Sequence, residues 1–324
     1  MIRIVYNKTN KCNEKGLMMM TTLKDEAIRY IKASDSSMKY YNLSPQEARA
    51  LKVVPKWTSP HSPQLAAIEN SKISVRDGAQ INVRIYRPVL DKILPVIVYY
   101  HGGGWVFGNL DSTDAGCQLL AEKAQAIVVS VDYRLAPEYT FPTPLFDAYD
   151  ALEWVDDNIQ HFGGDASTIT VAGDSAGGNL ATVVAYLAAT LNGPKIIAQA
   201  LIYPVVDVDF TTDSYSAYGE HYGLDKQGMQ WFADHYTDRQ NYKNPLVSPL
   251  HMEDLSVLPK TMIIAAEADV LYDEGLSYAQ KLAEANVEVE HIHMPGLIHS
   301  YFSKMAFFEA ATIDTVEKIA HFVK

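Results

Sequence analysis

A single serine stands where the chain is expected to turn sharply from a strand into a helix. Ser175 is the middle residue of the motif Gly-Asp-Ser-Ala-Gly at positions 173–177. The β-branched, apolar segment 167–172 before it predicts a buried strand, and the Ala- and Leu-rich segment 179–189 after it predicts a buried helix. A serine at such a turn can be a nucleophile, although Gly-x-Ser-x-Gly also occurs in turns that only link two elements. The flanking strand and helix favour the nucleophile.

A nucleophilic serine needs a general base, and the position of His299 suits that role. In a parallel sheet, residues that act together follow the carboxyl ends of the strands. His299 comes just after the strand predicted for residues 287–294. Other histidines lie inside that strand, or in connectors and helices without a matching partner. The first group is His291 and His293, and the second is His61, His161, His251 and His321.

The base in turn needs a carboxylate that orients it. Asp269 follows the strand predicted for residues 261–266, so it lies at the same edge of the sheet as the other two groups. The chain order Ser175, Asp269, His299 is the order in which one class of hydrolases carries nucleophile, acid and base. Other acids follow a strand or begin the next helix, where an acid also stabilises the helix dipole. These alternatives are Asp207, Asp209, Asp273 and Glu274.

Backbone N–H groups must also stabilise the oxyanion that forms when a serine attacks a carbonyl. Three glycines at positions 102–104 follow the predicted central strand 95–100, and no side chain obstructs their N–H groups. Ala176, which follows the serine, supplies one more N–H. A glycine-rich loop can instead bind phosphate. This one lacks both the Gly-Lys-Ser/Thr ending of a P-loop and the spacing of a dinucleotide-binding loop.

Three motifs together resemble the hormone-sensitive lipase family of α/β-hydrolases, in its bacterial carboxylesterase branch. They are His-Gly-Gly-Gly-Trp at 101–105, Asp-Tyr-Arg-Leu-Ala-Pro-Glu at 132–138 and Gly-Asp-Ser-Ala-Gly-Gly-Asn at 173–179. The resemblance covers the chain from about residue 40 to its end. It implies an α/β-hydrolase fold, in which helices flank a mostly parallel central sheet and a helical cap covers the site.

The resemblance also implies roles for individual residues. The nucleophile, acid and base would be Ser175, Asp269 and His299, and the oxyanion donors would be the N–H groups of Gly103, Gly104 and Ala176. His101, Arg134 and Glu138 would be structural. One stretch departs from the family: residues 268–273 read Ala-Asp-Val-Leu-Tyr-Asp where the family usually has Asp-Pro-Leu-Arg-Asp.

The regular alternation of strands and helices predicts an α/β architecture with one large catalytic domain. A hairpin over residues 67–86 is expected at a sheet edge, and the rhythm breaks in an aromatic-rich insertion with a helix near residues 225–236. We expect residues 1–17 to be a disordered extension, or the chain to start at one of the three methionines 18–20. The resemblance implies a cap (18–65 and 205–250) over a catalytic domain (66–204 and 251–324).

Aromatic residues beside the glycine loop and in the insertion predict a compact apolar pocket. The candidates are Trp105, Phe107, Tyr218 and His221, although each aromatic ring could equally belong to the core of the cap. A roofed pocket favours carboxylic esters with short to medium acyl chains, hydrolysed through an acyl-enzyme. An amidase, lactonase or deacetylase would use the same three side chains. A non-catalytic receptor of this fold would lack the histidine.

Composition narrows the partners further. With 27 Lys and Arg against 39 Asp and Glu, the chain of 324 residues has a net charge of −12, which disfavours nucleic acids and anionic membranes. Cys12 and Cys117 are too few for a disulfide framework, and no segment has the ~20 apolar residues of a transmembrane helix. We expect a cytoplasmic monomer or homodimer, without metal, cofactor or stable membrane association, that acts on a small-molecule ester.

Overall fold

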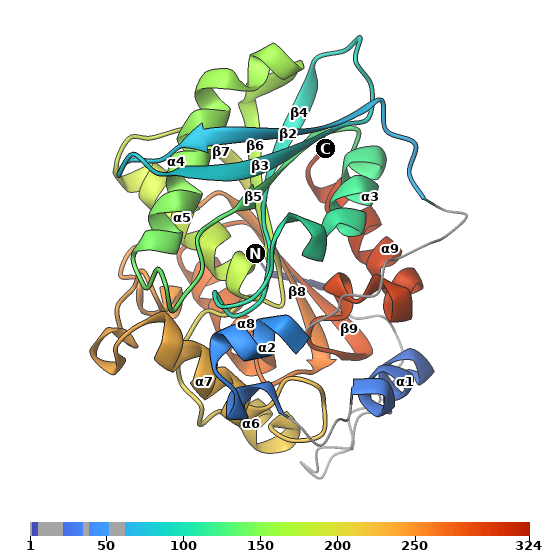
Figure 1. Ribbon diagram of the computed structural model, residues 1–324, viewed down its shortest axis with the longest axis vertical. Coiled ribbons are helices and arrows are strands. Elements are labelled where there is room, and N and C mark those ends of the chain that lie inside the picture. Colours follow the sequence, from blue (N-terminus) through green and yellow to red (C-terminus); the bar gives the residue numbers. More distant parts are fainter. Residues whose placement is uncertain (1, 6–21, 35–38, 52–61) are drawn as a thin grey trace.

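The computed structural model describes residues 2–5, 22–34, 39–51 and 62–324, and its strands there form one sheet (Figure 1). The strand order across the sheet is β1-β9-β8-β7-β6-β4-β5-β3-β2. The strands are β1 (Ile2–Val5), β2 (Ala67–Ser74), β3 (Gln80–Arg87), β4 (Leu94–Tyr100), β5 (Ile127–Asp132), β6 (Gly164–Asp174), β7 (Ile196–Ile202), β8 (Lys260–Ala268) and β9 (Val289–Ile298).

The central strands are parallel and buried on both faces. From β1 through β5 in the sheet order, neighbouring strands are parallel, whereas β2 and β3 form an antiparallel hairpin that pairs with β5. The near-continuous apolar runs of β4 and β5 fit this burial, because no face of these strands meets water. The predicted edge hairpin is confirmed, and the outer strand β2 is largely exposed.

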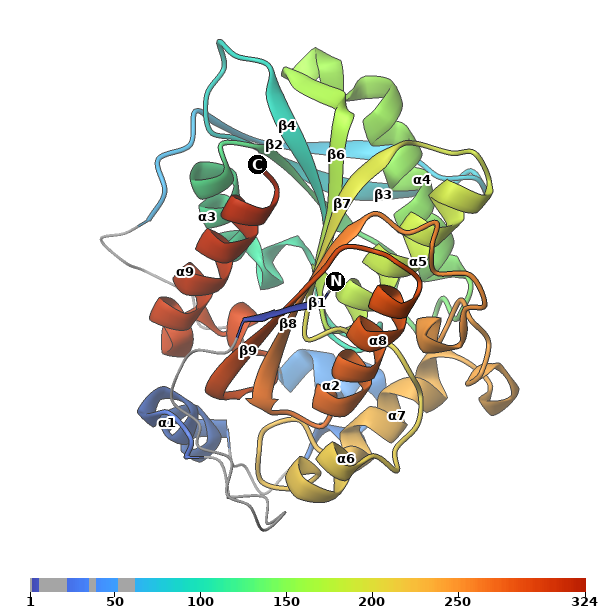
Figure 2. The same ribbon diagram turned by 180° about the vertical axis from the view of Figure 1, so that it is seen from behind.

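Helices cover both faces of the sheet (Figures 1 and 2). Helices α3 and α9 lie on one face, and α4, α5 and α8 lie on the other. The predicted layered α/β architecture is therefore confirmed. The bounds are α3 (Asp114–Ala124), α4 (Thr143–Asn158), α5 (Ala176–Thr190), α8 (Tyr272–Glu284) and α9 (Met305–Phe322).

Four further helices gather beyond the carboxyl ends of β8 and β9, which Figures 1 and 2 both show. They are α1 (Asp25–Ser34), α2 (Pro45–Leu51), α6 (Asp213–Tyr218) and α7 (Lys226–Tyr236). A capping box lies at the start of α2, since Ser44 and Glu47 exchange hydrogen bonds. The helix predicted near residues 225–236 is α7, and the Asp225 side chain accepts a hydrogen bond from the Gly228 N–H. The division into cap and catalytic domain stays a prediction.

The first strand differs from the expectation of a disordered extension over residues 1–17. Residues 2–5 pair in parallel with β9 as β1, so this short piece extends the sheet at its edge. A strand of four residues carries little pattern of its own, and its backbone partner lies almost the whole chain away. The remainder of that prediction, residues 6–17, lies outside the described residues.

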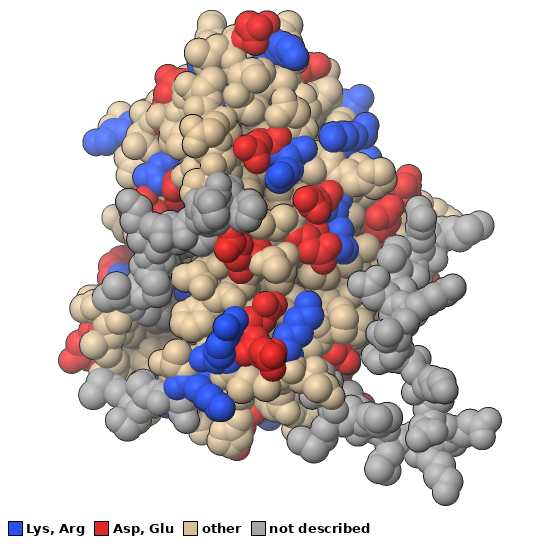
Figure 3. All heavy atoms as spheres, turned by 90° about the vertical axis from the view of Figure 1, so that its right-hand side faces the viewer, with Lys and Arg blue, Asp and Glu red and all other residues tan. Residues whose placement is uncertain are grey.

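Charges of both signs are interspersed on the face seen in Figure 3, where helices α3 and α9 lie. The excess of acidic residues is therefore not gathered into one patch on that face. None of the described helices is long and apolar enough to cross a membrane. Across the same described ranges, no three His, Cys, Asp or Glu side chains are placed as a metal ion would need them.

One buried histidine in β9 makes stability depend on pH. His291 is 1% exposed, and within the described part of the chain neither ring nitrogen has a hydrogen-bond partner. Burial, together with the positive charge of His293, lowers the pKa of His291 from 6.5 to about 4. The unfolded chain therefore takes up a proton before the folded chain as the pH falls. The stability that depends on neutral His291 is fully present above pH 6.5 and is lost between pH 6.5 and 4.

We predict that His291→Leu flattens this dependence. By linkage, the wild type should lose about 2 kcal/mol of unfolding free energy through this group between pH 7.5 and 5, and the variant should not. Urea titrations at both pH values, with His321→Leu as the exposed control, measure the difference. Equal losses in the wild type and His291→Leu would contradict the assignment.

Candidate active site

Ser175 lies at the tight turn between β6 and α5. Its backbone has φ 57° and ψ −119°, a conformation that non-glycine residues rarely adopt. The turn is fixed on both sides: the Ser175 N–H donates to the carbonyl O of Ile202, and the Ser175 carbonyl accepts from the N–H of Val205. The side chain is 7% exposed. The strained turn therefore holds the hydroxyl in one place beyond the end of the sheet.

The glycines on either side of Ser175 are required by close packing. A Cβ atom on Gly173 would lie 2.4 Å from the backbone of Gly177, and one on Gly177 would lie 2.0 Å from the carbonyl O of Tyr100. These contacts are shorter than any real Cβ makes, so α5 can approach β4 and β6 only with glycine at both positions. The structure thus explains the two glycines of the sequence motif.

His299 and Asp269 complete a chain of hydrogen bonds with the serine. The distance from His299 Nε2 to Ser175 Oγ is 2.9 Å, and the distance from His299 Nδ1 to Asp269 Oδ2 is 2.6 Å. All three side chains are buried, with exposed fractions of 7% or less. They follow the carboxyl ends of β6, β8 and β9, which are three different strands of the sheet. The structure therefore brings together the three residues that the sequence predicted.

The carboxylate of Asp269 decides which ring nitrogen of His299 carries the proton. An ionised carboxylate only accepts hydrogen bonds, so Nδ1 must donate to it. In the neutral ring, Nε2 then has a free lone pair and accepts from the Ser175 hydroxyl. The backbone N–H of Leu271 donates to the other oxygen, Asp269 Oδ1, at 3.0 Å and fixes the carboxylate. The arrangement can remove a proton from the serine.

The other candidate acids are used elsewhere. Asp207 contacts His251, Asp209 accepts from Thr211, Asp273 accepts from the Ser214 N–H, and Glu274 accepts from the Val206 N–H. In residues 62–324, where all of these lie, Asp269 alone is hydrogen-bonded to His299. Position in the sequence did not decide which of these acids orients His299, whereas the hydrogen bonds in the structure identify Asp269.

The other candidate histidines in the described part of the chain do not form hydrogen bonds with Ser175. His291 and His293 belong to β9, and His293 lies beside Glu267 and the hydroxyl of Tyr272. His161 and His321 are exposed on the surface. His61 lies outside the described residues. Within the described ranges, the histidine that contacts the serine is therefore the predicted one, His299.

The glycine loop after β4 presents unused N–H groups. Gly103 and Gly104 have φ values of 125° and 61°, which side chains disfavour. A Cβ on Gly103 would also lie 2.2 Å from the carbonyl O of Phe107. No described residue accepts a hydrogen bond from the backbone N–H of Gly103, Gly104 or Ala176. Ala176 begins α5, so the positive end of that helix dipole adds to the field at the serine.

A buried aspartate ties this loop to the serine turn. Asp174, directly before Ser175, accepts hydrogen bonds at Oδ1 from the Gly102 N–H and the Tyr99 hydroxyl, both at 2.9 Å. Burial raises the pKa of Asp174, and these two donors oppose the rise. His101, whose ring is buried against Tyr133 and bonded to the carbonyl O of Gly102, shapes the same loop. This fits the structural role that the resemblance implies for His101.

Comparison with known proteins then places the chain in a family. A family model for the α/β-hydrolase fold matches residues 97–303. The carboxylesterase NlhH of Mycobacterium tuberculosis is 40% identical over 258 residues, which cover 78% of this chain and 81% of that protein. The chain belongs to the hormone-sensitive lipase family of α/β-hydrolases. The predicted family and fold class are thereby confirmed.

Two further proteins that resemble the chain also carry the names of enzymes that hydrolyse esters. An ethyl acetate hydrolase of Pseudomonas putida is 38% identical over 251 residues, covering 75% of this chain and 78% of that protein. Among solved structures, an esterase of the fungus Rhizomucor miehei superposes with a TM-score of 0.88 at 35% identity, covering 94% of this chain and 96% of that one.

A cluster of aromatic rings packs beside the glycine loop. The ring of Phe107 packs against those of Tyr40, Trp231 and Phe232, with centroids 5.3–5.7 Å apart. Phe232 comes from α7 and lies so close to Gly104 that a Cβ there would be 2.3 Å from its ring. The cluster joins the N-terminal segment, the glycine loop and α7.

The other three pocket candidates lie differently. Trp105 is fully buried and stacks on Tyr236 with ring centroids 4.2 Å apart, so it has no face open to a substrate. Tyr218 is buried at the end of α6 against Tyr222. The His221 side chain is 90% exposed, which removes the reason for placing it in an enclosed pocket. The aromatic residues of the sequence indicate where rings gather, but they do not indicate which of these rings faces a pocket.

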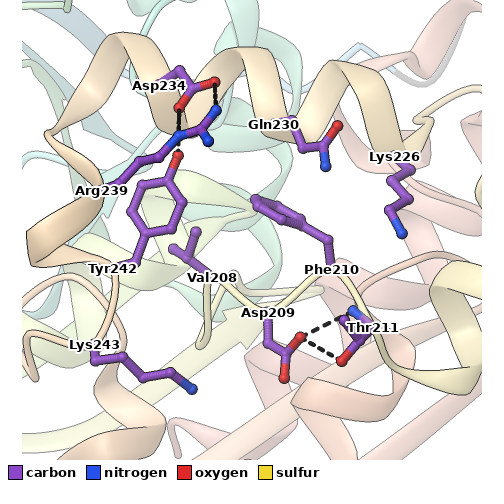
Figure 4. A pocket seen from close by; sticks show the side chains of 10 residues that line it. All are labelled: Val208, Asp209, Phe210, Thr211, Lys226, Gln230, Asp234, Arg239, Tyr242 and Lys243. Atoms are coloured by element: carbon purple, nitrogen blue, oxygen red, sulfur yellow. Dashed lines mark hydrogen bonds and ion pairs between the residues drawn. The ribbon is translucent and has the colours of Figure 1, made fainter.

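A separate hollow of about 500 Å³ lies on the far side of α7 (Figure 4). Lys226, Gln230 and Asp234 line it from one face of that helix, opposite the face that carries Phe232. Arg239 and Tyr242 close it by bonding to Asp234. Neither the serine nor its two partners line this hollow, so it is not the site of the chemistry.

Two residues that support the site, Phe232 and Arg49, are not among those predicted from the sequence. Phe232 had a usable signal, because the residues of α7 buried with it, Met229, Ala233 and Tyr236, recur at helical spacing. Arg49 of α2 had none. Its partners Val106 and Glu138 lie 57 and 89 residues further along the chain, and no local pattern predicts such contacts.

Proposed function

We propose that this carboxylic ester hydrolase is a serine esterase that works through an acyl-enzyme on Ser175. The observation that carries the proposal is the unbroken chain of hydrogen bonds from Ser175 Oγ through the His299 ring to Asp269. The esterase names of relatives at 38–40% identity support the same reaction class. Both lines of support are independent, since one is geometric and the other is sequence similarity.

The reaction has two halves, of which the first forms the acyl-enzyme and the second hydrolyses it. His299 Nε2 takes the proton from the Ser175 hydroxyl as Oγ attacks the ester carbonyl carbon. Asp269 stabilises the imidazolium that results, because its Oδ2 lies 2.6 Å from Nδ1 and accepts the hydrogen bond of the Nδ1 proton. The imidazolium then gives its proton to the departing alcohol, and the tetrahedral intermediate collapses to the acyl-enzyme. A water molecule, activated by His299 in the same way, hydrolyses the acyl-enzyme.

The negative charge of the tetrahedral intermediate needs donors that are in place beforehand. The N–H groups of Gly103, Gly104 and Ala176 suit this role, since no described residue occupies them. Their loop is held by Asp174 and His101, so the donors need not reorganise when the charge develops. Removal of one such donor typically costs roughly 10²–10³ in kcat.

The aromatic cluster favours small acyl groups. Phe232 fills the space beside Gly104, and Phe107 and Trp231 pack around it. An acyl chain whose carbonyl oxygen lies on the glycine N–H groups would soon meet these rings. We therefore assign short- to medium-chain esters as substrates, which agrees with the name of the ethyl acetate hydrolase relative.

The test compares rates on p-nitrophenyl esters from acetate to palmitate. The wild type should peak at short or medium chains. Phe232→Ala removes the ring beside Gly104 and should move the peak toward longer chains, at a stability cost of about 3–5 kcal/mol from the cavity. Phe162→Ala, which removes a partly buried ring packed on Trp154, is the matched control and should leave the peak in place. An unchanged peak in Phe232→Ala would contradict the assignment of the acyl pocket, and no hydrolysis of any ester by folded wild type would overturn the esterase mechanism.

A further inference from the structure

Arg49 connects helix α2 to two loops beside the active site. Its Nε donates to the carbonyl O of Val106 at 2.8 Å, and Nη2 donates to the carbonyl O of Ala136. The same guanidinium forms a two-pronged ion pair with the carboxylate of Glu138, at 2.9 and 2.8 Å. One side chain of the N-terminal segment therefore bonds to the glycine loop and to the loop that follows β5.

The carbonyl group of Val106 belongs to the turn that carries the candidate oxyanion donors. The N–H groups of Val106 and Phe107 both donate to the carbonyl O of Gly103, at 3.2 and 2.8 Å. The Ala136 N–H donates to the carbonyl O of Trp105 at 2.9 Å, which joins the two loops directly. Arg49 thus fixes this turn through the carbonyl O of Val106. Within the turn, Gly103 packs closely against the backbone of Phe107.

We propose that Arg49 is a positioning residue for ester hydrolysis: it holds the turn of Gly103 and Gly104 in the geometry that stabilises the oxyanion. The proposal rests on the oxyanion role proposed above for these two glycines. Arg49 itself touches no reacting atom. It acts through the carbonyl groups of Val106 and Ala136, and it makes this geometry depend on the docking of α2.

The exposure of the ion pair separates this role from ordinary stabilisation. The side chains of Arg49 and Glu138 are 28% and 40% exposed, and ion pairs at such exposure contribute little to global stability. Rates are far more sensitive than stability to the placement of oxyanion donors, since a shift of about 1 Å can cost 10²-fold. The guanidinium fork is also specific, because its donors lie on three nitrogens and bond two carbonyls and a carboxylate together, whereas the donors of a lysine all lie on one atom.

The experiment measures kcat, KM and thermal midpoint on p-nitrophenyl butyrate for the wild type, Arg49→Ala and Arg49→Lys. The matched control is Gln46→Ala on the same helix, because Gln46 bonds to Glu138 but not to the glycine loop. We expect kcat to fall roughly 10- to 100-fold in Arg49→Ala and less in Arg49→Lys, with KM within about threefold of the wild type. Gln46→Ala should keep its kcat.

Two readouts exclude a merely structural role. The inhibition constant of a trifluoromethyl ketone, which forms a tetrahedral oxyanion on the serine, should rise in Arg49→Ala by the factor that kcat/KM falls. Methylguanidinium added at millimolar concentration should restore part of the lost kcat, and methylammonium should not. Should Arg49→Ala fail to fold, Arg49→Lys gives the same comparison of kcat with the inhibition constant.

The outcomes distinguish this inference from the proposed function. Undiminished kcat in folded Arg49→Ala, or a loss confined to KM, overturns the positioning role, provided that wild-type hydrolysis disappears in Ser175→Ala. A loss of kcat equal to that of Gln46→Ala overturns it as well. Hydrolysis that survives in Ser175→Ala would instead overturn the proposed function itself.

Discussion

Replacing Ser175 with alanine is expected to lower kcat for ester hydrolysis by roughly 10⁴- to 10⁶-fold. The hydroxyl is the group that His299 Nε2 contacts at 2.9 Å, and the substitution removes that oxygen alone. The strained backbone, with φ 57°, is shared by both proteins, so the fold should be retained. What remains is the catalysis that ester binding and the oxyanion donors supply without a nucleophile.

Rates on p-nitrophenyl butyrate, together with covalent labelling by a fluorophosphonate, check this result. The wild type should gain the mass of one phosphonyl group and lose activity in step, whereas Ser175→Ala should gain none. The matched control is Ser167→Ala, because Ser167 lies near the start of β6, the strand that leads to Ser175. This variant should behave as the wild type. A labelled Ser175→Ala, or one with more than about 1% of wild-type activity, would place the nucleophile elsewhere.

The parts of the site that could be predicted from sequence are those with local patterns. Ser175 lies between a β-branched run and an Ala-rich run, and these became β6 and α5. Asp269 and His299 each follow an apolar run that became a strand, so the rule for carboxyl ends of parallel strands was enough to bring them together. The glycine run after a predicted central strand, with Ala176 after the serine, also indicated the oxyanion donors, and the family resemblance narrowed the glycines to Gly103 and Gly104.

The parts that could not be predicted depend on contacts between distant segments. Strand β1 forms because its backbone pairs with the edge strand β9, and the sequence of its four residues does not indicate that partner. Trp105 and Phe232 are both aromatic neighbours of the glycine loop, yet one is enclosed by Tyr236 and the other faces Gly104. Only the packing of α7 decides which ring faces the site. The same holds for Arg49, whose partners come from loops far along the chain.

Asp269→Asn is the second substitution with a large expected effect, and it tests the direction of the hydrogen bonds. An asparagine can turn its NH₂ group toward His299 Nδ1, and Nδ1 must then accept a hydrogen bond. The ring proton moves to Nε2, which can no longer accept the proton of Ser175. Since the shape of the side chain hardly changes, the loss comes from the wrong tautomer. A tautomer change of this kind costs about 10⁴-fold in kcat.

Steady-state rates and the rate of fluorophosphonate labelling should fall together in Asp269→Asn, because both need the same proton transfer from Ser175. The matched control is Asp273→Asn, four residues away, whose carboxylate accepts the Ser214 N–H and does not bond to His299. An asparagine oxygen can still accept that bond, so Asp273→Asn should stay within about threefold of the wild type. If Asp269→Asn kept a tenth of the activity while Asp207→Asn lost it, the acid would be Asp207, since Asp207 also follows a strand of the same sheet. The 2.6 Å contact of Asp269 with His299 makes the opposite outcome the expected one.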